Sequence, residues 1–373
     1  MAKKNDRRKK GGNKVVRNII IGVEALVLIA VIVVLIFVFK NTKNDEETGA
    51  TIYRIPEDEI IFNPPANGES VEDIPEMKEY TTLAFFGVDA RNGTLKKGTR
   101  TDTIIICAID NETGDVRLCS VYRDTLLNIG TQENASYQKC NAAYAYGGPE
   151  QALNMLNQNL DLYITKFVTV GFDGVMKTVD AVGGVDIDIQ QNEIKYLNDY
   201  QASMYSTETN TVITDNYVPV TDTGLQTLSG YQALAYCRIR YTSGDDFRRT
   251  ERQRDVLKQI VTKAKKVNPK QITTIVNDVL PYVATNMDVD QEIIPMATKV
   301  GDYEIVESKG FPFDGKIKTG LLGSKGSCVI PVDLLSNVED LHAFLYPDVE
   351  YTPSQTVIDI SNSISSEASK YGY

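Results

Sequence analysis

Apolar and β-branched runs in the middle of the chain predict β-strands. The segment 82–88 is almost wholly apolar, which is typical of a buried strand, and 103–109 and 116–121 are β-branched runs joined by a turn containing Asn and Gly. Two shorter runs, 167–170 and 185–189, flank a helical segment and predict a strand–helix–strand unit. Strands interleaved with helices in this way indicate an α/β fold.

Helix start and stop signals accompany these strands. Pro149 stands at the first position of a helix, where its missing N–H is tolerated, and the helix 174–181 stops at a glycine pair, Gly183-Gly184. Ser229 and Gln232 have the spacing of a capping box, which opens a short helix. The helices are therefore expected to begin and end at residues that satisfy their terminal backbone groups.

Two segments lack a periodic pattern, and a third carries the histidine. Residues 195–223 are polar and predict an irregular surface insertion, and the serine-rich segment 361–373 is expected to be a frayed, flexible tail. Residues 338–345 predict an amphipathic helix that contains His342, the one histidine of the chain. A single histidine disfavours Ser-His-Asp and Cys-His mechanisms and excludes a His-rich metal site.

The first forty residues predict a membrane anchor. Residues 1–18 carry eight positive charges and one negative charge, and residues 19–39 are apolar apart from Glu24. Because about 20 apolar residues span a bilayer and no small-residue cleavage site follows, we expect an uncleaved signal anchor. The alternative is a buried helix of a soluble core. The positive-inside rule places the basic tail in the cytoplasm and the rest outside, with the acidic, proline-containing segment 40–79 as an extracellular linker.

The net charge of the chain limits the classes of partner that it could bind. The whole chain carries a net charge of −11, so that about −18 remains once the +7 of the basic tail is removed, which argues against nucleic acid as a partner.

The five cysteines show no metal-type spacing. Cys107 and Cys119 lie on two strands of one predicted hairpin, which leaves open a disulfide or two buried thiols. The remaining cysteines, whose pairing stays equally open, are Cys140, Cys237 and Cys328.

Arginine is concentrated in two windows that lie more than a hundred residues apart. Ten of the eleven arginines beyond residue 50 belong to them: Arg91, Arg100, Arg117 and Arg123 in the first, and Arg238, Arg240, Arg248, Arg249, Arg252 and Arg254 in the second. The guanidinium group is planar and always charged, and it grips phosphate or carboxylate in a bidentate manner. We therefore expect the fold to bring both windows together around a polyanion.

Aspartates accompany the arginines of the first window at predicted strand ends. Asp89 directly follows one strand and Asp102 precedes the next, so that both could flank one cleft and share Mg²⁺, which prefers a few carboxylates plus phosphate oxygens. The alternative is a pair of turn aspartates that cap loops. Arg123 is expected to project into the same region with Asp124 orienting its guanidinium, the alternative being a surface salt bridge.

The second window begins with two arginines at a spacing of two. If the segment is extended, Arg238 and Arg240 point to one side and Ile239 points into the core. This arrangement would present both guanidinium groups to the same ligand.

The rest of the second window lies at the start of a long predicted helix. Asp246 is its expected cap, and an apolar stripe continues it to about residue 266. Stepping back from this stripe by three and four residues places Arg249, Arg252 and Gln253 on the inward face. Because a buried arginine needs a partner, these groups face either a bound anion or an internal network with Asp245 or Asp246.

Seven segments, taken in order, resemble the LytR–CpsA–Psr family. They are Gly87-Val-Asp89-x-Arg91, Arg100-Thr-Asp102-Thr103, Arg123-Asp124, Asn141-Ala-Ala-Tyr-x-Tyr-Gly-Gly148, Val179-Asp-x-x-Gly-Gly-Val185, Gln232-Ala-Leu-Ala-Tyr-Cys-Arg238-Ile-Arg240 and Asp246-Phe-x-Arg249-x-x-Arg252-Gln253. The resemblance implies a three-layer α/β/α sandwich with a central mixed sheet that encloses an apolar lipid channel, preceded by one transmembrane helix. The catalytic domain would cover 80–266, and 267–360 would form a C-terminal α/β extension packed on it.

The resemblance also implies a function. Members of the family transfer a glycopolymer, such as teichoic acid or capsule, from a polyprenyl-pyrophosphate carrier to peptidoglycan at the outer face of the cell membrane of a Gram-positive-type bacterium. By residue match, Asp89 and Asp102 would hold Mg²⁺ or Mn²⁺, Asp246 would be the base near the acceptor hydroxyl, and Arg123 would be catalytic. The residue match and the inward face of the predicted helix together give the residues expected to bind the pyrophosphate. They are Arg91, Arg100, Arg123, Arg238, Arg240, Arg249, Arg252 and Gln253.

One position departs from the family pattern. Tyr122 stands where members usually have proline before the Arg-Asp pair, and it is expected to shift the Arg123 loop slightly while leaving the charged groups intact. Two other functions use much of the same chemistry. They are a polyprenyl-pyrophosphate hydrolase with water as acceptor, and a non-catalytic membrane regulator that binds polyprenyl phosphate.

Overall fold

The computed structural model describes most of the chain beyond residue 50. The described residues are 51–52, 55–56, 59–68, 70–88, 95–204, 217–240, 248–249, 252–253, 255–256, 259–260, 263, 282–288, 291–292 and 303–373. The predicted membrane segment 19–39 lies outside them, as do Asp89, Arg91 and Asp246. Among the described residues, no helix is both long enough and apolar enough to cross a bilayer.

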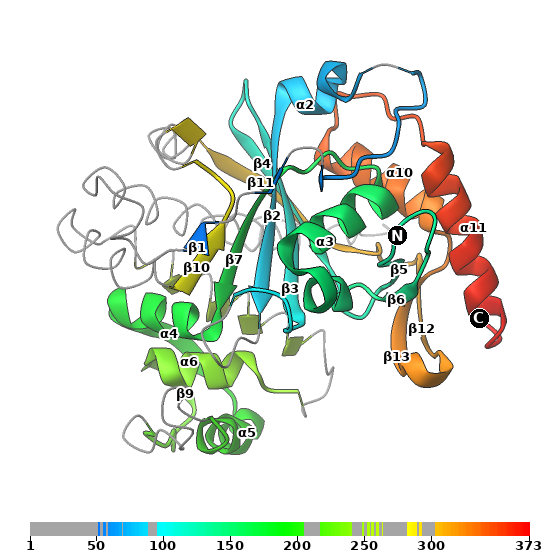
Figure 1. The fold of residues 1–373 in the computed structure, drawn as a ribbon. Helices are drawn as coiled ribbons and strands as arrows, with labels where there is room; N and C mark the ends of the chain where they lie inside the picture. Colours follow the sequence, from blue (N-terminus) through cyan, green and yellow to red (C-terminus); the bar gives the residue numbers. More distant parts are fainter. Residues whose placement is uncertain are drawn as a thin grey trace, which may run out of the picture.

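A seven-stranded mixed sheet forms the middle of the molecule (Figure 1). In spatial order its strands are β1 (Thr51–Ile52), β10 (Val283–Thr285), β7 (Lys166–Gly171), β2 (Tyr80–Val88), β3 (Thr101–Asp110), β4 (Asp115–Val121) and β11 (Glu304–Phe311). Strands β2, β3 and β4 are antiparallel neighbours, whereas β7 runs parallel to β2 and β11 runs parallel to β4. The carboxyl ends of β2, β4, β7 and β11 therefore share one edge of the sheet with the amino end of β3.

Helices cover both faces of this sheet because its central strands are apolar on both sides. In β2, Leu83 and Phe85 belong to one core cluster, and Ala84 and Phe86 belong to the cluster on the other face. The first cluster is completed by α4 (Phe172–Ala181), α5 (Gln191–Ala202) and α6 (Gly230–Cys237), and the second by α3 (Ala142–Leu160), α10 (Leu334–Leu345) and α11 (Gln355–Ser369). Figure 1 shows these two groups of helices on opposite sides of the sheet, so the predicted α/β class with a central mixed sheet is confirmed.

Three two-stranded antiparallel sheets and three short helical turns lie around this core. The small sheets are β5 (Leu126–Asn128) with β6 (Tyr137–Lys139), β8 (Val185–Ile189) with β9 (Gly224–Leu228), and β12 (Ile317–Leu321) with β13 (Ser327–Pro331). The helical turns are η2 (Val71–Asp73), α2 (Pro75–Glu79) and η7 (Gly323–Lys325). The hairpin β12–β13 lies next to β5, which brings it close to the end of β4.

The predicted helix boundaries are confirmed where they rest on capping chemistry. The backbone of Gly148 has φ 72° and ψ −155°, which interrupts α3 so that its longer part begins at Pro149. At the start of α6, the Ser229 hydroxyl accepts from the Gln232 N–H at 3.3 Å and the Gln232 side chain accepts from the Ser229 N–H at 3.0 Å. Both halves of the capping box are therefore formed.

Three expectations about polar or terminal segments need correction. The segment 195–223 is not wholly irregular, because α5 continues through Ala202. An apolar stripe that includes the fully buried Leu197 stabilises this part of the helix. The segment 361–373 is not a frayed tail, because α11 extends to Ser369 and packs Ile364 and Ala368 against the core. Beyond residue 266, β10 and β11 are strands of the central sheet, so this region completes the domain as well as packing on it.

Candidate functional site

The sheet edge where four strands end carries part of the predicted set of polar residues, Asp102 and Arg123 among them. Gly87 pairs with Thr103 and Val88 pairs with Thr101, so Asp102 is the extra residue of a bulge in β3. Bulges of this kind re-aim a side chain and are frequent beside functional sites. The two strands approach closely at Gly87, where a Cβ would lie 3.0 Å from the Thr103 Cβ, which is tighter than an ordinary contact. The β2–β3 register therefore sets the direction of Asp102.

The loop that carries Arg123 is fixed by its own backbone. The carbonyl oxygen of Arg123 accepts from the Asn141 N–H at 3.1 Å, and that of Asp124 accepts from the Val329 N–H at 2.9 Å. The Tyr122 N–H donates to the Phe311 carbonyl at 3.0 Å, a bond that the proline usual at this position could not make. Tyr122 therefore ties the loop to β11.

A cavity of about 340 Å³ at this edge brings the two arginine windows together. We call it the sheet-edge cavity; it is lined by Asp102, Thr103, Ile104, Ser120, Val121, Tyr122, Arg123, Asp124, Arg249, Gln253, Thr319, Ser327, Cys328 and Val329. Arg123 comes from the first window, and Arg249 comes from the second. The convergence expected from the sequence is thus present for these two guanidinium groups.

Hydrogen bonds and ion pairs hold the charged and polar side chains of the sheet-edge cavity in place. The Arg123 Nη1 is hydrogen-bonded to Asp102 Oδ1, and its Nε lies 3.6 Å from Asp124 Oδ2. Asp124 is also paired with Lys139 at 3.2 Å. Across the cavity, the Thr103 hydroxyl donates to Gln253 Oε1 at 3.4 Å. Fixed charges of both signs, partly removed from water, are the environment that phosphate chemistry uses.

The predicted arginines do not all reach the sheet-edge cavity. Arg100 is exposed at the start of β3, and Arg240 is half-buried outside the cavity. Arg238 is the C-cap of α6 with a helical backbone, so the segment is not extended there, although Ile239 is fully buried as expected. The Arg238 guanidinium lies 5.5 Å from the Phe172 ring centroid, a cation–π distance.

Arg252 occupies a different environment from the one predicted for it. Its Nε donates to Glu193 Oε1 at 2.8 Å, and both side chains are almost fully buried. Its Nη1 donates to the Ile239 carbonyl at 3.2 Å. An internal ion pair of the kind that the sequence left as an alternative is therefore present for Arg252, with Glu193 as a partner. Asp245 and Asp246 lie outside the described residues. The roles of Asp89, Arg91 and Asp246 stay predictions, because these residues lie outside the described part.

The oxygen groups of the sheet-edge cavity suit a divalent cation of the magnesium type. The carboxylates of Asp102 and Asp124 and the hydroxyls of Thr103 and Ser120 line the same space, and Mg²⁺ binds through one or two carboxylates when phosphate oxygens complete its shell. Among the residues that the structure places, no three His, Cys, Asp or Glu side chains cluster as a ready metal site. The predicted second ligand, Asp89, lies outside these residues.

The hairpin β12–β13 forms a wall of the sheet-edge cavity that the sequence did not reveal. Thr319, Ser327, Cys328 and Val329 line the cavity, and Thr125 forms an isolated bridge with Val329. No motif marks these residues, and the resemblance is loose in this part of the chain. The adjacent β-branched residues Val329 and Ile330 were the available signal for a strand, but they do not indicate its position beside the Arg123 loop.

Tyr373 packs against strand β12 and so supports this wall of the cavity. Its hydroxyl accepts from the Leu321 N–H at 3.1 Å, and its ring lies against Gly320, where a Cβ would overlap it. We expect Tyr373→Ala to lower the free energy of unfolding by about 1–2 kcal/mol, because it removes this packing, and Tyr373→Phe to cost less. Denaturant titration measures both variants. Equal stability of Tyr373→Ala and the parent protein would contradict the supporting role.

The five cysteines are free and buried. Cys107 and Cys119 lie on neighbouring strands but in core clusters on opposite faces of the sheet, so their thiols point apart. Burial raises the pKa of the Cys107 and Cys119 thiols, and it raises the pKa of Cys237 to about 12. The sequence left open a disulfide or two buried thiols for Cys107 and Cys119, and the structure has two buried thiols.

We expect all five thiols to titrate in the denatured, unreduced protein and to react very slowly in the native protein at pH 8. The thiolate is the reactive species, and raised pKa values together with burial keep it scarce and inaccessible. A thiol-reactive chromophore with and without denaturant measures this difference. A count of three in the denatured protein would reveal a disulfide.

His342 is a structural residue of α10. It is 1 % exposed, its ring stacks on Tyr351 with centroids 3.7 Å apart, and its Nε2 lies 2.9 Å from the Leu160 carbonyl oxygen. These are interior packing contacts, and His342 does not line the sheet-edge cavity.

Comparison with known proteins points to one family. The model of the LytR_cpsA_psr family matches residues 38–324. Biofilm regulatory protein A of Streptococcus mutans is 28% identical over 242 residues, covering 63% of this chain and 56% of that protein. The polyisoprenyl-teichoic acid–peptidoglycan teichoic acid transferase TagV of Bacillus subtilis is 27% identical over 223 residues, covering 59% and 53%. The match thus spans little more than half the length of these relatives.

The fold is also that of a solved structure. Protein gbs0355 from Streptococcus agalactiae superposes with a TM-score of 0.56 and 25% identity, covering 75% of this chain and 91% of that chain. The likeness extends to the mixed central sheet and its helices, which position the sheet-edge cavity.

Proposed function

This chain belongs to the LytR_cpsA_psr family, and on that premise we propose that it transfers a phosphate-linked glycopolymer, such as a teichoic acid, from a polyprenyl-pyrophosphate carrier to peptidoglycan. The observation that carries the proposal is the convergence of Arg123 and Arg249, from two distant windows, on one cavity that also contains Asp102. A relative named as a teichoic acid transferase supports the choice of substrate class.

The proposed reaction is a displacement at phosphorus. The acceptor hydroxyl oxygen attacks the phosphorus that bears the glycan, the bond from this phosphorus to the bridging oxygen breaks, and polyprenyl monophosphate leaves. The hydroxyl proton passes to a carboxylate, for which Asp246 is the predicted group. Such transfer needs mainly alignment and charge stabilisation, which the Arg123 and Arg249 guanidinium groups supply to the pyrophosphate oxygens.

We propose Mg²⁺ or Mn²⁺ as the cofactor, held by Asp102 with Asp89 as the predicted second ligand. The ion would neutralise negative charge on the pyrophosphate when bound. Asp102 is suited to this role because the β3 bulge aims it at the same space as Arg123. Gln253, held by Thr103, would orient the substrate from the opposite wall.

We further propose that residues 19–39 anchor the protein in the cell membrane with its catalytic domain outside. The basic tail and the long run 19–39, which is apolar apart from Glu24, support this orientation. It would place the sheet-edge cavity on the side of the bilayer where peptidoglycan lies and where no ATP is available. The pyrophosphate bond of the donor would then supply the free energy.

Reconstitution tests the proposal. Full-length protein in detergent is incubated with lipid-linked glycopolymer, peptidoglycan sacculi and Mg²⁺, and polymer covalently bound to the sacculi is measured. We expect attached polymer and polyprenyl monophosphate in equal amounts. Release of free polymer despite the acceptor would favour a hydrolase, and binding of the lipid without turnover would favour a non-catalytic regulator.

A further inference from the structure

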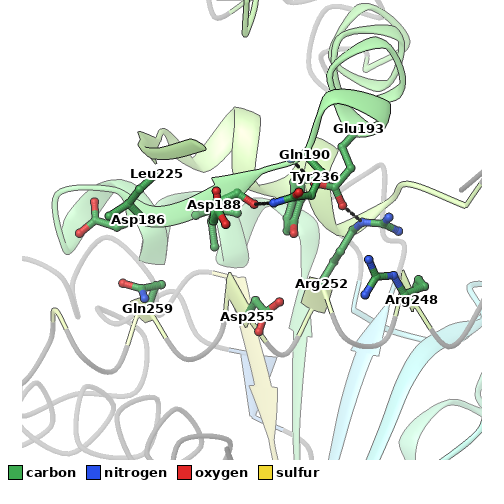
Figure 2. A pocket seen from close by; sticks show the side chains of 11 residues that line it. Asp186, Asp188, Gln190, Glu193, Leu225, Tyr236, Arg248, Arg252, Asp255 and Gln259 are labelled. Atoms are coloured by element: carbon green, nitrogen blue, oxygen red, sulfur yellow. Dashed lines mark hydrogen bonds and ion pairs between the residues drawn. The ribbon is translucent and has the colours of Figure 1, made fainter. Parts of the chain in front are cut away.

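A second cavity lies on the other flank of the helical residues that line the sheet-edge cavity. Arg249 and Gln253 face the sheet-edge cavity, whereas the second cavity, of about 440 Å³, is lined by Arg248, Arg252, Asp255 and Gln259. Positions four apart share one helix face, so the two cavities use different faces of the same segment. We call the second one the helix-flank cavity. Figure 2 shows its opposite wall, formed by Asp186, Asp188, Gln190 and Glu193.

Several charges of the helix-flank cavity already have partners. Glu193 is paired with Arg252, and Asp186 is paired with Lys263 at 2.8 Å and accepts from the Thr227 hydroxyl at 2.6 Å. Asp188 is exposed, and its carboxylate makes no ion pair or side-chain hydrogen bond within the described residues. The cavity therefore mixes compensated charges of both signs with groups that are able to accept hydrogen bonds.

Tyr236 offers the helix-flank cavity a hydroxyl without a partner among the described residues. The residue is 4 % exposed and lines the helix-flank cavity, and its hydroxyl forms no hydrogen bond in the part of the chain that the structure describes. This oxygen is not one of the fully enclosed unpaired atoms, so it opens onto the cavity, where a ligand can bond to it. Burial raises the pKa of Tyr236, as do the nearby Glu193 and Asp255 carboxylates, so the group stays a neutral donor.

The chemistry of the helix-flank cavity selects against simple ions. The carboxylates of Asp188 and Asp255 oppose an anion, and the guanidinium groups of Arg248 and Arg252 oppose a cation. A phenol donor, carboxylate acceptors and the amides of Gln190 and Gln259 together match a ligand whose groups both donate and accept. At the rim, Leu225 is 75% exposed and offers an apolar surface.

We propose that the helix-flank cavity binds carbohydrate. A sugar ring presents hydroxyl groups that donate to Asp188 and accept from the Tyr236 hydroxyl, and it presents an apolar C–H face that packs on Leu225. The inference rests on the proposed function, in which both donor and acceptor are glycans. The shared helix wall would then hold a glycan on one flank while Arg249 and Gln253 hold the pyrophosphate on the other.

Two conservative variants test the carbohydrate site. Titration calorimetry with chitotetraose is performed on the full-length protein and on Tyr236→Phe and Asp188→Asn, with Asp348→Asn as a matched exposed control near the opposite edge of the sheet. We expect chitotetraose to bind the parent protein and the control alike, and to bind each variant about tenfold more weakly. The inference is overturned if chitotetraose does not bind the parent protein, or if both variants bind it as tightly as the parent does.

The two possible sources of the glycan are separated by competition. A lysozyme-released peptidoglycan disaccharide and a lipid-free fragment of the polymer are each added to the chitotetraose complex. Displacement by either one supports the site and identifies the acceptor or the donor as its ligand, whereas displacement by neither overturns it. Pyrophosphate binding should be unchanged in Tyr236→Phe, so failure of the glycan site and failure of the proposed function give different results.

Discussion

Arg123→Ala is expected to lower the rate of polymer attachment about a thousandfold while leaving the protein folded. Arg123 is positioned by a loop whose carbonyl groups are bonded to Asn141 and Val329, so the guanidinium is preorganised before the substrate binds. Loss of one preorganised charge at a phosphoryl group costs on the order of 10²–10³ in rate, and a dedicated arginine costs more. Radiolabelled polymer bound to sacculi measures the rate.

Arg117→Ala is the matched control for this variant. Arg117 lies on β4 in the same window but near the turn at the opposite edge of the sheet, where it approaches Asp115 at 3.8 Å. It does not line the sheet-edge cavity, so its removal should leave the attachment rate within about twofold of the parent. Normal attachment by Arg123→Ala, or equal losses in both variants, would remove Arg123 from the site.

Arg252→Ala is expected to destabilise the protein by about 3–5 kcal/mol. The change leaves the Glu193 carboxylate buried without its main countercharge, and breaking one side of a buried ion pair has this cost. Glu193 also accepts from the Gln190 N–H at 3.0 Å at the start of α5, so the disturbance reaches that helix. Denaturant titration measures the loss.

The same variant separates two roles for Arg252. Arg248→Ala, four positions earlier on the same face but exposed, should leave the unfolding free energy unchanged. Replacing both buried partners, as in Arg252→Met with Glu193→Leu, should recover much of the stability because no uncompensated charge remains. If Arg252→Ala instead lost attachment activity at full stability, the pyrophosphate-binding role predicted from the sequence would be restored.

The parts of the fold that could be predicted from the sequence are those with a local physical cause. The central strands β2, β3 and β4 were predictable because their apolar and β-branched runs report burial directly. The capping box at Ser229 and the break before Pro149 were predictable because each satisfies terminal backbone groups within a few residues. Arg249 and Gln253 were placed inward correctly because helical spacing relates them to the apolar stripe.

What the sequence could not supply depends on contacts between distant segments. Glu193 pairs with Arg252 across 59 positions, and neither residue has a local pattern that names the other. Helix α11 was missed because its serines hide the stripe of Val357, Ile360, Ile364 and Ala368, which packs against α3 and α10. The wall formed by β12 and β13 was missed because its position depends on the bridge between Thr125 and Val329.

The central claim is that guanidinium groups from both windows bind one diphosphate. A crystal structure of the full-length protein with geranyl diphosphate and Mg²⁺ tests it most directly. We predict that the diphosphate occupies the sheet-edge cavity, with its oxygens about 2.7–3.2 Å from nitrogens of both Arg123 and Arg249. A diphosphate bound elsewhere, or held by Arg123 or Arg249 alone, would contradict the account.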